Sequence, residues 1–331
     1  MFGDAAIPAN LKGIIRSYGV LIGLALIVVV ASILEPAFLT WGNLLNILRQ
    51  ASVIGIVSLG VTYVMMTGGL DLSVGAVVSF CSVVAISFMN RYGNAGGSPF
   101  AAALAILAAL SIGFAIGLAN GSIIALLNGR LGETFIITYG MQIVIASLAL
   151  LFGGGQFIPG KFAMGAYQRM GMGFTPIVCF LALAAIMQFV LAYTGFGKKV
   201  SFIGANIECA RMSGIKVGQL RILTYGICGM CAGFAAIIVT SRVNSASPLQ
   251  GTGYELEAIA AVVVGGTSQS GGKGGIVNTI LGVLVLSVLG NVLNVIGVDA
   301  NAQLLVRGAI IVIAVGLDMW NKMVNQRGAV K

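Results

Sequence analysis

Long apolar runs, separated by short polar stretches, follow one another along most of this chain. A helix needs about 20 predominantly apolar residues to cross the hydrocarbon layer of a bilayer. The runs lie at residues 18–34, 51–66, 74–89, 100–127, 135–152, 174–193, 222–240, 256–266, 276–296 and 304–320. The run at 256–266 is too short to cross unaided and predicts a broken or re-entrant helix near 255–267. The pattern therefore predicts an all-α polytopic membrane protein with about ten transmembrane helices.

Composition makes lipid the natural solvent for most of the surface. Charged residues make up 8% of the 331 residues, and hydrophobic residues make up 58%. A soluble domain carries about 25% charged residues. So few charges could not cover a soluble protein of this length. We therefore expect contact with membrane lipid along most of the chain.

Positive charge between the apolar runs predicts the orientation. The segment 195–221 contains one acid, Glu208, and five bases: Lys198, Lys199, Arg211, Lys216 and Arg221. Positively charged loops remain in the cytoplasm, so this segment is expected there. With ten crossings, Lys12 and Arg16 near the start and the bases near the end also fall inside, so both termini are predicted to be cytoplasmic. The bias is incomplete, because the predicted exterior loops contain Arg49, Arg91, Lys161, Arg169 and Arg242. This rule explains the net charge of +9 without a nucleic-acid partner.

The residue inventory argues against enzymatic chemistry in this chain. It has no histidine, and the C-x-x-C of Cys228 and Cys231 lies in an apolar run, where packed thiols are expected. The stretch Thr267–Gly274 resembles a phosphate-binding loop, but it lacks the first glycine and the hydroxyl residue after Lys273. We expect no catalytic residue, no metal site and no bound cofactor. Any ATP, with its Mg, must be hydrolysed by a partner.

Glycine-rich breaks at residues 67–73 and 265–275 interrupt the apolar pattern, and acids lie in the first break and shortly before the second. Asp71 stands at membrane depth, where an acid suggests function, but Asp71 and Ser73 also precede a helix and could cap it, which is the favoured interpretation. Glu255 and Glu257 open the short apolar run, where acids complement a helix N-terminus. Elsewhere, Gly113, Gly117 and Gly121 form a small-residue face that predicts close helix packing, with a mobile seam as the alternative.

The polar segment at 195–221 contains a short predicted helix. It follows Asn206, spans Ile207 to Ser213 and ends at Gly214, with Ala210, Met212 and Ile215 as an apolar surface. A basic loop and a docking helix for a cytoplasmic motor are both consistent with these residues.

Three stretches together resemble the membrane-spanning permeases of ribose-, xylose- and galactoside-type ABC importers. They are residues 68–75 (GGLDLSVG), 202–216 (FIGANIECARMSGIK) and 254–274 (YELEAIAAVVVGGTSQSGGKG), and the similarity extends over nearly the whole chain. Leu70, Glu257 and Ala205 stand where the family usually has Ile, Asp and Gly. These departures are mild, and the motifs identify the family better than they identify the sugar.

The resemblance implies an architecture and a set of partners. The chain would be one transmembrane permease domain over 1–331, similar to the ten-helix importer permeases for vitamin B12, in the inner membrane of a bacterium. It would pair with a second permease copy, as a homodimer or heterodimer, with a cytoplasmic ABC ATPase and with an extracytoplasmic sugar-binding protein. Residues 206–216 would be the helix that couples to the ATPase, through Asn206, Glu208, Ala210, Arg211, Ser213 and Gly214. Residues expected to serve gating are Gly68, Gly69, Asp71, Ser73, Glu255, Glu257, Gly265, Gly266, Gly271 and Gly272.

A neutral polyhydroxyl cargo would need a path with modest polarity. Candidates, chosen as polar side chains within the predicted spans, are Thr62, Asn120, Gln142, Asn291 and Asn294. An interhelical hydrogen bond is the favoured alternative for each of them. The cargo could be a pentose, a hexose, a polyol or autoinducer-2. An ion-coupled secondary transporter remains the rival class, because the two breaks permit an ion site at a broken helix.

Overall fold

The computed structural model describes residues 9–93, 98–127, 129, 131–162, 165–299, 301–306, 308, 309, 312 and 316. The helices are α1 (Ala9–Leu34), α2 (Trp41–Met66), α3 (Val74–Tyr92), α4 (Pro99–Leu126), α5 (Leu131–Gly153), α6 (Ala166–Arg169), α7 (Thr175–Tyr193), α8 (Gly195–Ala205), α9 (Ile207–Met212), α10 (Val217–Val243), α11 (Tyr254–Val264) and α12 (Ile276–Val295). A short 3₁₀ helix, η1 (Pro36–Leu39), separates α1 from α2, and two short strands, β1 (Ile158–Pro159) and β2 (Ser245–Ala246), pair antiparallel.

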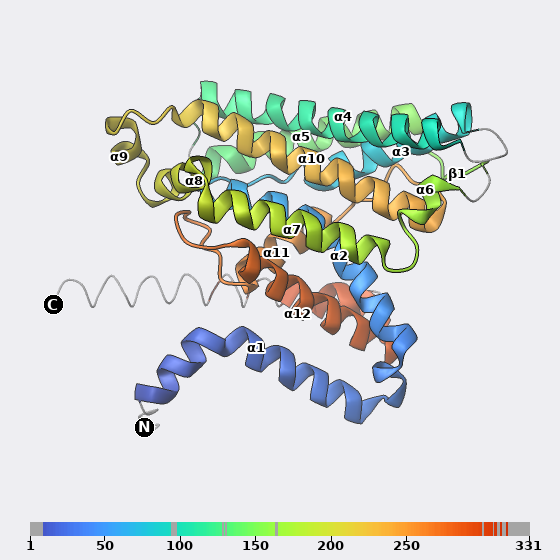
Figure 1. The fold of residues 1–331 in the computed structure, drawn as a ribbon, viewed down its shortest axis with the longest axis horizontal. Helices are drawn as coiled ribbons and strands as arrows, with labels where there is room; N and C mark the ends of the chain where they lie inside the picture. Colours follow the sequence, from blue (N-terminus) through green and yellow to red (C-terminus); the bar gives the residue numbers. More distant parts are fainter. Residues whose placement is uncertain are drawn as a thin grey trace.

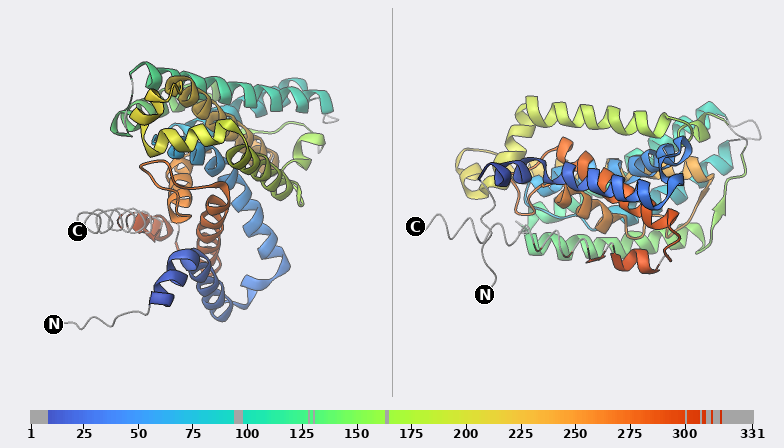
Figure 2. Two further views of the ribbon diagram at one scale, coloured as in Figure 1. Left: turned by 60° about the vertical axis from the view of Figure 1, so that its left-hand side comes forward. Right: turned by 90° about the horizontal axis from the view of Figure 1, so that it is seen from below.

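The long helices run along one common direction, which gives the molecule two distinct ends (Figure 1). The short helix α9 lies at one end, and β1, β2 and α6 lie at the other; we call these the α9 end and the β1 end. The helices α2 and α10 cross the middle in opposite directions. At the edge, α1 packs against α12 (Figure 2).

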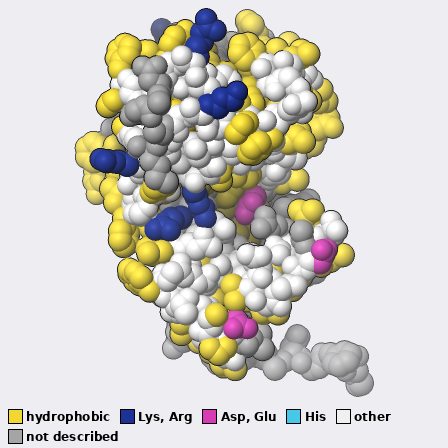
Figure 3. Space-filling view, turned by 90° about the vertical axis from the view of Figure 1, so that its right-hand side faces the viewer, with side chains coloured by type: hydrophobic (Ala, Val, Ile, Leu, Met, Phe, Trp, Pro, Cys, Tyr) yellow, Lys and Arg dark blue, Asp and Glu magenta, His cyan; other side chains and the backbone are white. Residues whose placement is uncertain are grey.

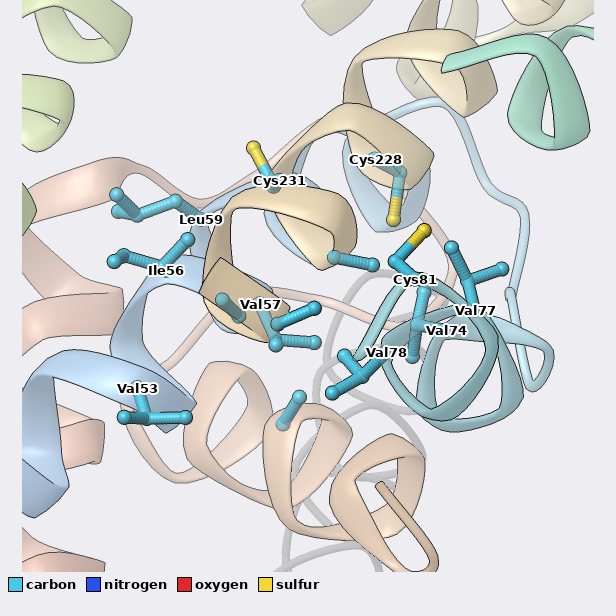
Figure 4. Packing of buried hydrophobic residues seen from close by; sticks show 14 of the residues in the cluster. Val53, Ile56, Val57, Leu59, Val74, Val77, Val78, Cys81, Cys228 and Cys231 are labelled. Atoms are coloured by element: carbon cyan, nitrogen blue, oxygen red, sulfur yellow. The ribbon is translucent and has the colours of Figure 1, made fainter. Parts of the chain in front are cut away.

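The core is formed by α2, α3 and α10. Figure 4 shows valines of α2 and α3 packed beside Cys228 and Cys231 of α10. Both cysteines are buried and free, as is Cys81 of α3. This confirms the prediction of packed thiols. By contrast, α5 and α7 present most of their apolar side chains outward, as expected for helices that face lipid.

Among the described residues, seven helices are long and apolar enough to cross a membrane: α2, α3, α4, α5, α7, α10 and α12. The expected ten crossings are therefore not established. The short helix expected near 255–267 is α11, with 11 residues. In α1, the described apolar part is Leu21–Ile33. The run at 304–320 and the bases near the C-terminus lie mostly outside the described residues.

The helix α2 begins at Trp41, not near Ala51 as the hydrophobic pattern indicated. Polar residues in this first part made it look like a loop. In the structure they have partners: Asn43 and Asn291 exchange two hydrogen bonds of 2.8 Å, and Arg49 donates to the carbonyl of Gly173. Asn46 accepts a bond from Arg242, which lies in the last turn of α10. Arg49 and Arg242 are thus helical residues, which corrects their expected place in loops.

The glycine face of α4 packs directly on α10. A Cβ atom at Gly113 would overlap the carbonyl oxygen of Gly229, and one at Gly117 would overlap that of Tyr225. Such contact of backbone with backbone is how small residues bring membrane helices together. The predicted close packing is confirmed.

Replacing Gly117 by Leu should therefore destabilise the folded protein by about 1–3 kcal/mol, because the side chain must push α4 away from α10. Gly140→Leu is the matched control, because Gly140 lies on α5 with no atom near the position of a Cβ. Thermal unfolding in detergent measures the difference. Equal midpoints for the two variants would contradict the packing described here.

Candidate functional site

Residues 67–73 leave α2 and pass through the interior before α3 begins, and beyond Gly69 their backbone N–H groups make no helical hydrogen bonds. Thr67, Asp71, Leu72 and Ser73 are buried there. A backbone group away from water must find an internal partner, because leaving it unpaired costs several kcal/mol. Two helices distant in the sequence, α5 and α10, supply those partners.

Side chains from α5 and α10 satisfy the backbone of this segment. Leu70 N donates to Thr134 Oγ1 at 3.3 Å, and Leu72 N donates to Thr138 Oγ1 at 3.1 Å. From the opposite side, Tyr225 Oη donates to Leu70 O at 2.8 Å. The non-helical segment is thus fixed between α5 and α10. Sequence reasoning missed these three residues because nothing local distinguishes them from ordinary residues of a span.

Asp71 anchors the start of α3. Its Oδ1 accepts hydrogen bonds from the backbone N and the hydroxyl of Ser73, at 2.9 and 2.6 Å. The Ser73 hydroxyl in turn accepts from Asn120 Nδ2 of α4 at 2.7 Å. Asp71 therefore binds the residue that precedes α3, not the N–H groups of its first turn. The chain Asp71–Ser73–Asn120 ties residues 67–73 to α4.

Most of the polar residues proposed for a path make contacts between helices. Thr62 shares a 2.7 Å hydrogen bond with Thr279 of α12, and Gln142 Nε2 donates to Glu255 Oε1 at 3.1 Å. Asn120 and Asn291 are bonded as described above, and Asn294 is exposed. The structure does not bring these five residues together around one cavity.

The second break, residues 265–275, folds back onto the end of α2. Gly272 N donates to Met66 O at 3.1 Å, and a Cβ atom at Gly204 of α8 would overlap Met66 O. At Gly271, a Cβ would lie 2.8 Å from Gly68 N and 2.7 Å from the Cα of Gly204. Both breaks and the last turn of α8 therefore meet at one point, directly before α9 in the sequence.

The helix α9 is built as the sequence predicted, one residue shorter. The Asn206 side chain accepts bonds from Glu208 N and Cys209 N at 3.0 Å each, which caps the helix. At the other end Gly214 has a φ of +76°, the left-handed conformation that a glycine stop adopts. Arg211 pairs with Glu208 at 3.5 Å.

The apolar surface predicted for α9 is only partly exposed. Ala210 is buried against Ile203 and Val217, and Ile215 packs on the same cluster. Met212 is 88% exposed. The inward side of α9 therefore holds it to α8 and α10, and Met212, Ser213 and the Glu208–Arg211 pair form its outer surface.

The two acids of α11 face different surroundings. Glu255 is buried and accepts hydrogen bonds from Gln142 and from Gly253 N. Its Oε2 has no hydrogen-bond partner among the described residues and lies against Gly75 of α3. Glu257 is half-buried and lines a cavity of about 400 Å³ between α2, α10, α11 and α12.

That cavity collects polar residues from helices far apart in the sequence. Gln50, Arg242, Tyr254, Glu257 and Ser287 lie around it, over an apolar base that includes Val53, Ile54 and Val239. Figure 3 shows basic and acidic side chains beside a hollow at the β1 end. Of this set, the sequence suggested only Glu257 as a candidate. Gln50 and Arg242 were missed because they lie just outside the predicted spans at 51–66 and 222–240.

Apolar helices with hydrogen-bonded non-helical segments between them are typical of an integral membrane protein, and a polar cavity that opens at one end is typical of the transport class. A family model described as a branched-chain amino acid transport system / permease component matches residues 43–315. The chain belongs to this family.

Curated relatives match over nearly their full length. The ribose import permease protein RbsC of Bacillus subtilis is 39% identical over 93% of this chain and 94% of its own length. RbsC of Escherichia coli K12 is 38% identical over 90% and 92%, and the galactose/methyl galactoside import permease protein MglC of the same organism is 36% identical over 92% and 94%. No solved structure matches significantly. The family resemblance inferred from the three motifs is confirmed.

Thr138→Val should destabilise the protein by about 1–3 kcal/mol, because it keeps the shape of the side chain but leaves Leu72 N buried without an acceptor. Ser147→Ala on the same helix is the control: the Ser147 hydroxyl is exposed and donates only to Ile143 O, one turn earlier. Thermal unfolding in detergent is the measurement. An unchanged midpoint for Thr138→Val would show that α5 does not hold residues 67–73.

Proposed function

We propose that this chain is the membrane permease subunit of a monosaccharide ABC importer. The observation that carries the proposal is the similarity to ribose import permeases along more than nine-tenths of the chain. The chain supplies the passage, and a separate cytoplasmic ATPase binds ATP and Mg. A sugar-binding protein outside the membrane delivers the cargo, and a second permease copy completes the passage.

The proposed topology has ten crossings in the inner membrane of a bacterium. It adds α1, the short helix α11 and the helical segment that begins at Asn301 to the seven long apolar helices. The α9 end is cytoplasmic, which agrees with the bases at 195–221. The start of α1 lies at this same end (Figure 1), which supports a cytoplasmic N-terminus. An architecture of the vitamin B12 importer type remains part of this proposal.

The proposed mechanism is alternating access driven from the α9 end. ATP binding and hydrolysis in the partner move α9, and α8 moves with it because Ala210 packs against Ile203. At the end of α8, Gly204 contacts Met66, directly before the first break, and Gly271 and Gly272 in the second, so the movement would reach residues 67–73 and 265–275 together. The cargo can shift the equilibrium between the two access states only by as much as its affinity for them differs. Pathway roles for Thr62, Asn120, Gln142, Asn291 and Asn294 remain predictions.

Reversing the charge of Arg211 tests the docking of α9. Arg211→Glu should reduce retention of the ATPase on a tagged permease, and sugar uptake by the reconstituted importer, by about tenfold, the effect expected when a charge at an interface is reversed. Arg211→Lys should restore both in part.

Arg169→Glu is the matched control, because Arg169 is an exposed base in α6 at the opposite end. It should leave ATPase retention unchanged. If scrambling residues 206–216 leaves transport normal, α9 is not the docking helix. If uptake follows an ion gradient and needs no ATP, the importer proposal is wrong and the chain is a secondary transporter.

A further inference from the structure

The cavity between α2, α10, α11 and α12 has the dimensions of a binding site for one small molecule. Its volume of about 400 Å³ lies within the 300–1,000 Å³ that is usual for ligand pockets. It extends from Arg242 in the last turn of α10 to Ile54, near the middle of α2. A molecule at its base would be well inside the helix bundle.

The charges in the cavity favour a neutral ligand. Only 8% of this chain is charged, yet Arg242 and Glu257 reach the same cavity from different helices. Charged side chains among apolar helices are costly, and they mark substrate paths. Because the two charges are opposite, an anion or a cation would meet one unfavourable partner. A molecule with hydroxyl groups can accept from the guanidinium and donate to the carboxylate.

Neighbouring residues hold these groups in place. Arg242 Nη2 donates to Asn46 Oδ1 at 2.7 Å, which uses one of its five N–H donors. Glu257 lies in the first turn of α11, which Glu255 fixes through its bond to Gln142. Gln50 and Ser287 add an amide and a hydroxyl, and Tyr254 adds an aromatic ring. The cavity thus offers donors, acceptors and an apolar face.

The cavity is closed toward the α9 end. On the α9 side of the cavity, Thr62 and Thr279 join α2 to α12, with 2.7 Å between their hydroxyl oxygens. Gly282 of α12 packs so closely on α11 that a Cβ there would overlap Ala261 O. A molecule that enters from the β1 end (Figure 3) would therefore stop in the cavity until these helices separate.

We propose that this cavity binds one neutral monosaccharide inside the permease, with Arg242, Glu257, Gln50 and Ser287 as hydrogen-bonding partners for its hydroxyl groups. The proposal rests on the proposed function and extends it, because it gives the permease its own sugar site apart from that of the binding protein. The adjoining cavity of about 250 Å³ is lined mainly by apolar residues such as Leu256, Leu289 and Leu304, and offers a sugar few partners.

Chemical labelling of the complete importer tests the site directly. A Ser287→Cys variant in right-side-out vesicles should react with a membrane-impermeant maleimide, and free ribose or galactose should slow the reaction at least about threefold when it occupies the site. When Glu257→Gln is added to this variant, the sugar concentration needed to slow the labelling should rise about tenfold, because a charged hydrogen-bond partner has been removed. Of the native cysteines only Cys209 is exposed, and it lies on α9 at the opposite end.

Gln156→Cys is the matched control, because Gln156 is exposed and lies in the segment between α5 and β1, outside the cavity. It should be labelled at a rate that sugar does not change. As a second measurement, Glu257→Gln should change the ratio of ribose to galactose uptake, which a merely structural role would leave constant.

The outcomes separate the two proposals. Labelling of the Ser287→Cys variant that no sugar slows, with an unchanged uptake ratio in Glu257→Gln, overturns the sugar site but leaves an active importer intact. A wild-type complex that neither hydrolyses ATP nor accumulates a monosaccharide overturns the proposed function itself.

Discussion

The structure depends on one constraint: every backbone N–H and C=O away from water must find a partner inside the protein. Helices satisfy this alone, but residues 70–73 do not. Their partners are Thr134, Thr138 and Tyr225, from helices that the sequence places far from the segment. The same constraint explains why Gly272 N reaches the last carbonyl of α2. The non-helical segments are therefore the parts of the molecule most dependent on the arrangement of all the other helices.

Because the two non-helical breaks depend on contacts with other helices, they are the places where the bundle can change shape. A rigid helix bundle changes shape where its segments are held by a few contacts between elements and not by their own hydrogen bonds. Through Gly204, the end of α8 contacts Met66, directly before the first break, and Gly271 and Gly272 of the second break, and the short helix α9 follows α8. In the proposed mechanism, a movement of α9 would reach the interior by this route.

Polar residues in this protein serve two different purposes. Asn43, Asn291, Thr62 and Thr279 join helices in pairs, as polar side chains in apolar surroundings commonly do. Around the cavity, polar groups from four helices instead face a common space. The two acids of α11 illustrate the contrast: Glu255 is buried against α3 and α5, and Glu257 opens onto the cavity. Two positions along one helix are enough to separate the structural role from the proposed binding role.

The sequence alone determined the membrane class, most apolar helices, the short helix α11, the cap and stop of α9 and the family, because each of these depends on local composition or on a contiguous motif. It did not reveal the true start of α2, since the polar residues Asn43, Asn46 and Arg49 resemble a loop until their partners are known. Nor did it reveal the cavity, which unites Gln50, Arg242, Tyr254 and Ser287 across more than 230 positions of sequence. Only the tertiary structure decided these features, because the hydrogen-bond partners of these polar side chains, and their neighbours around the cavity, lie on helices distant in the sequence.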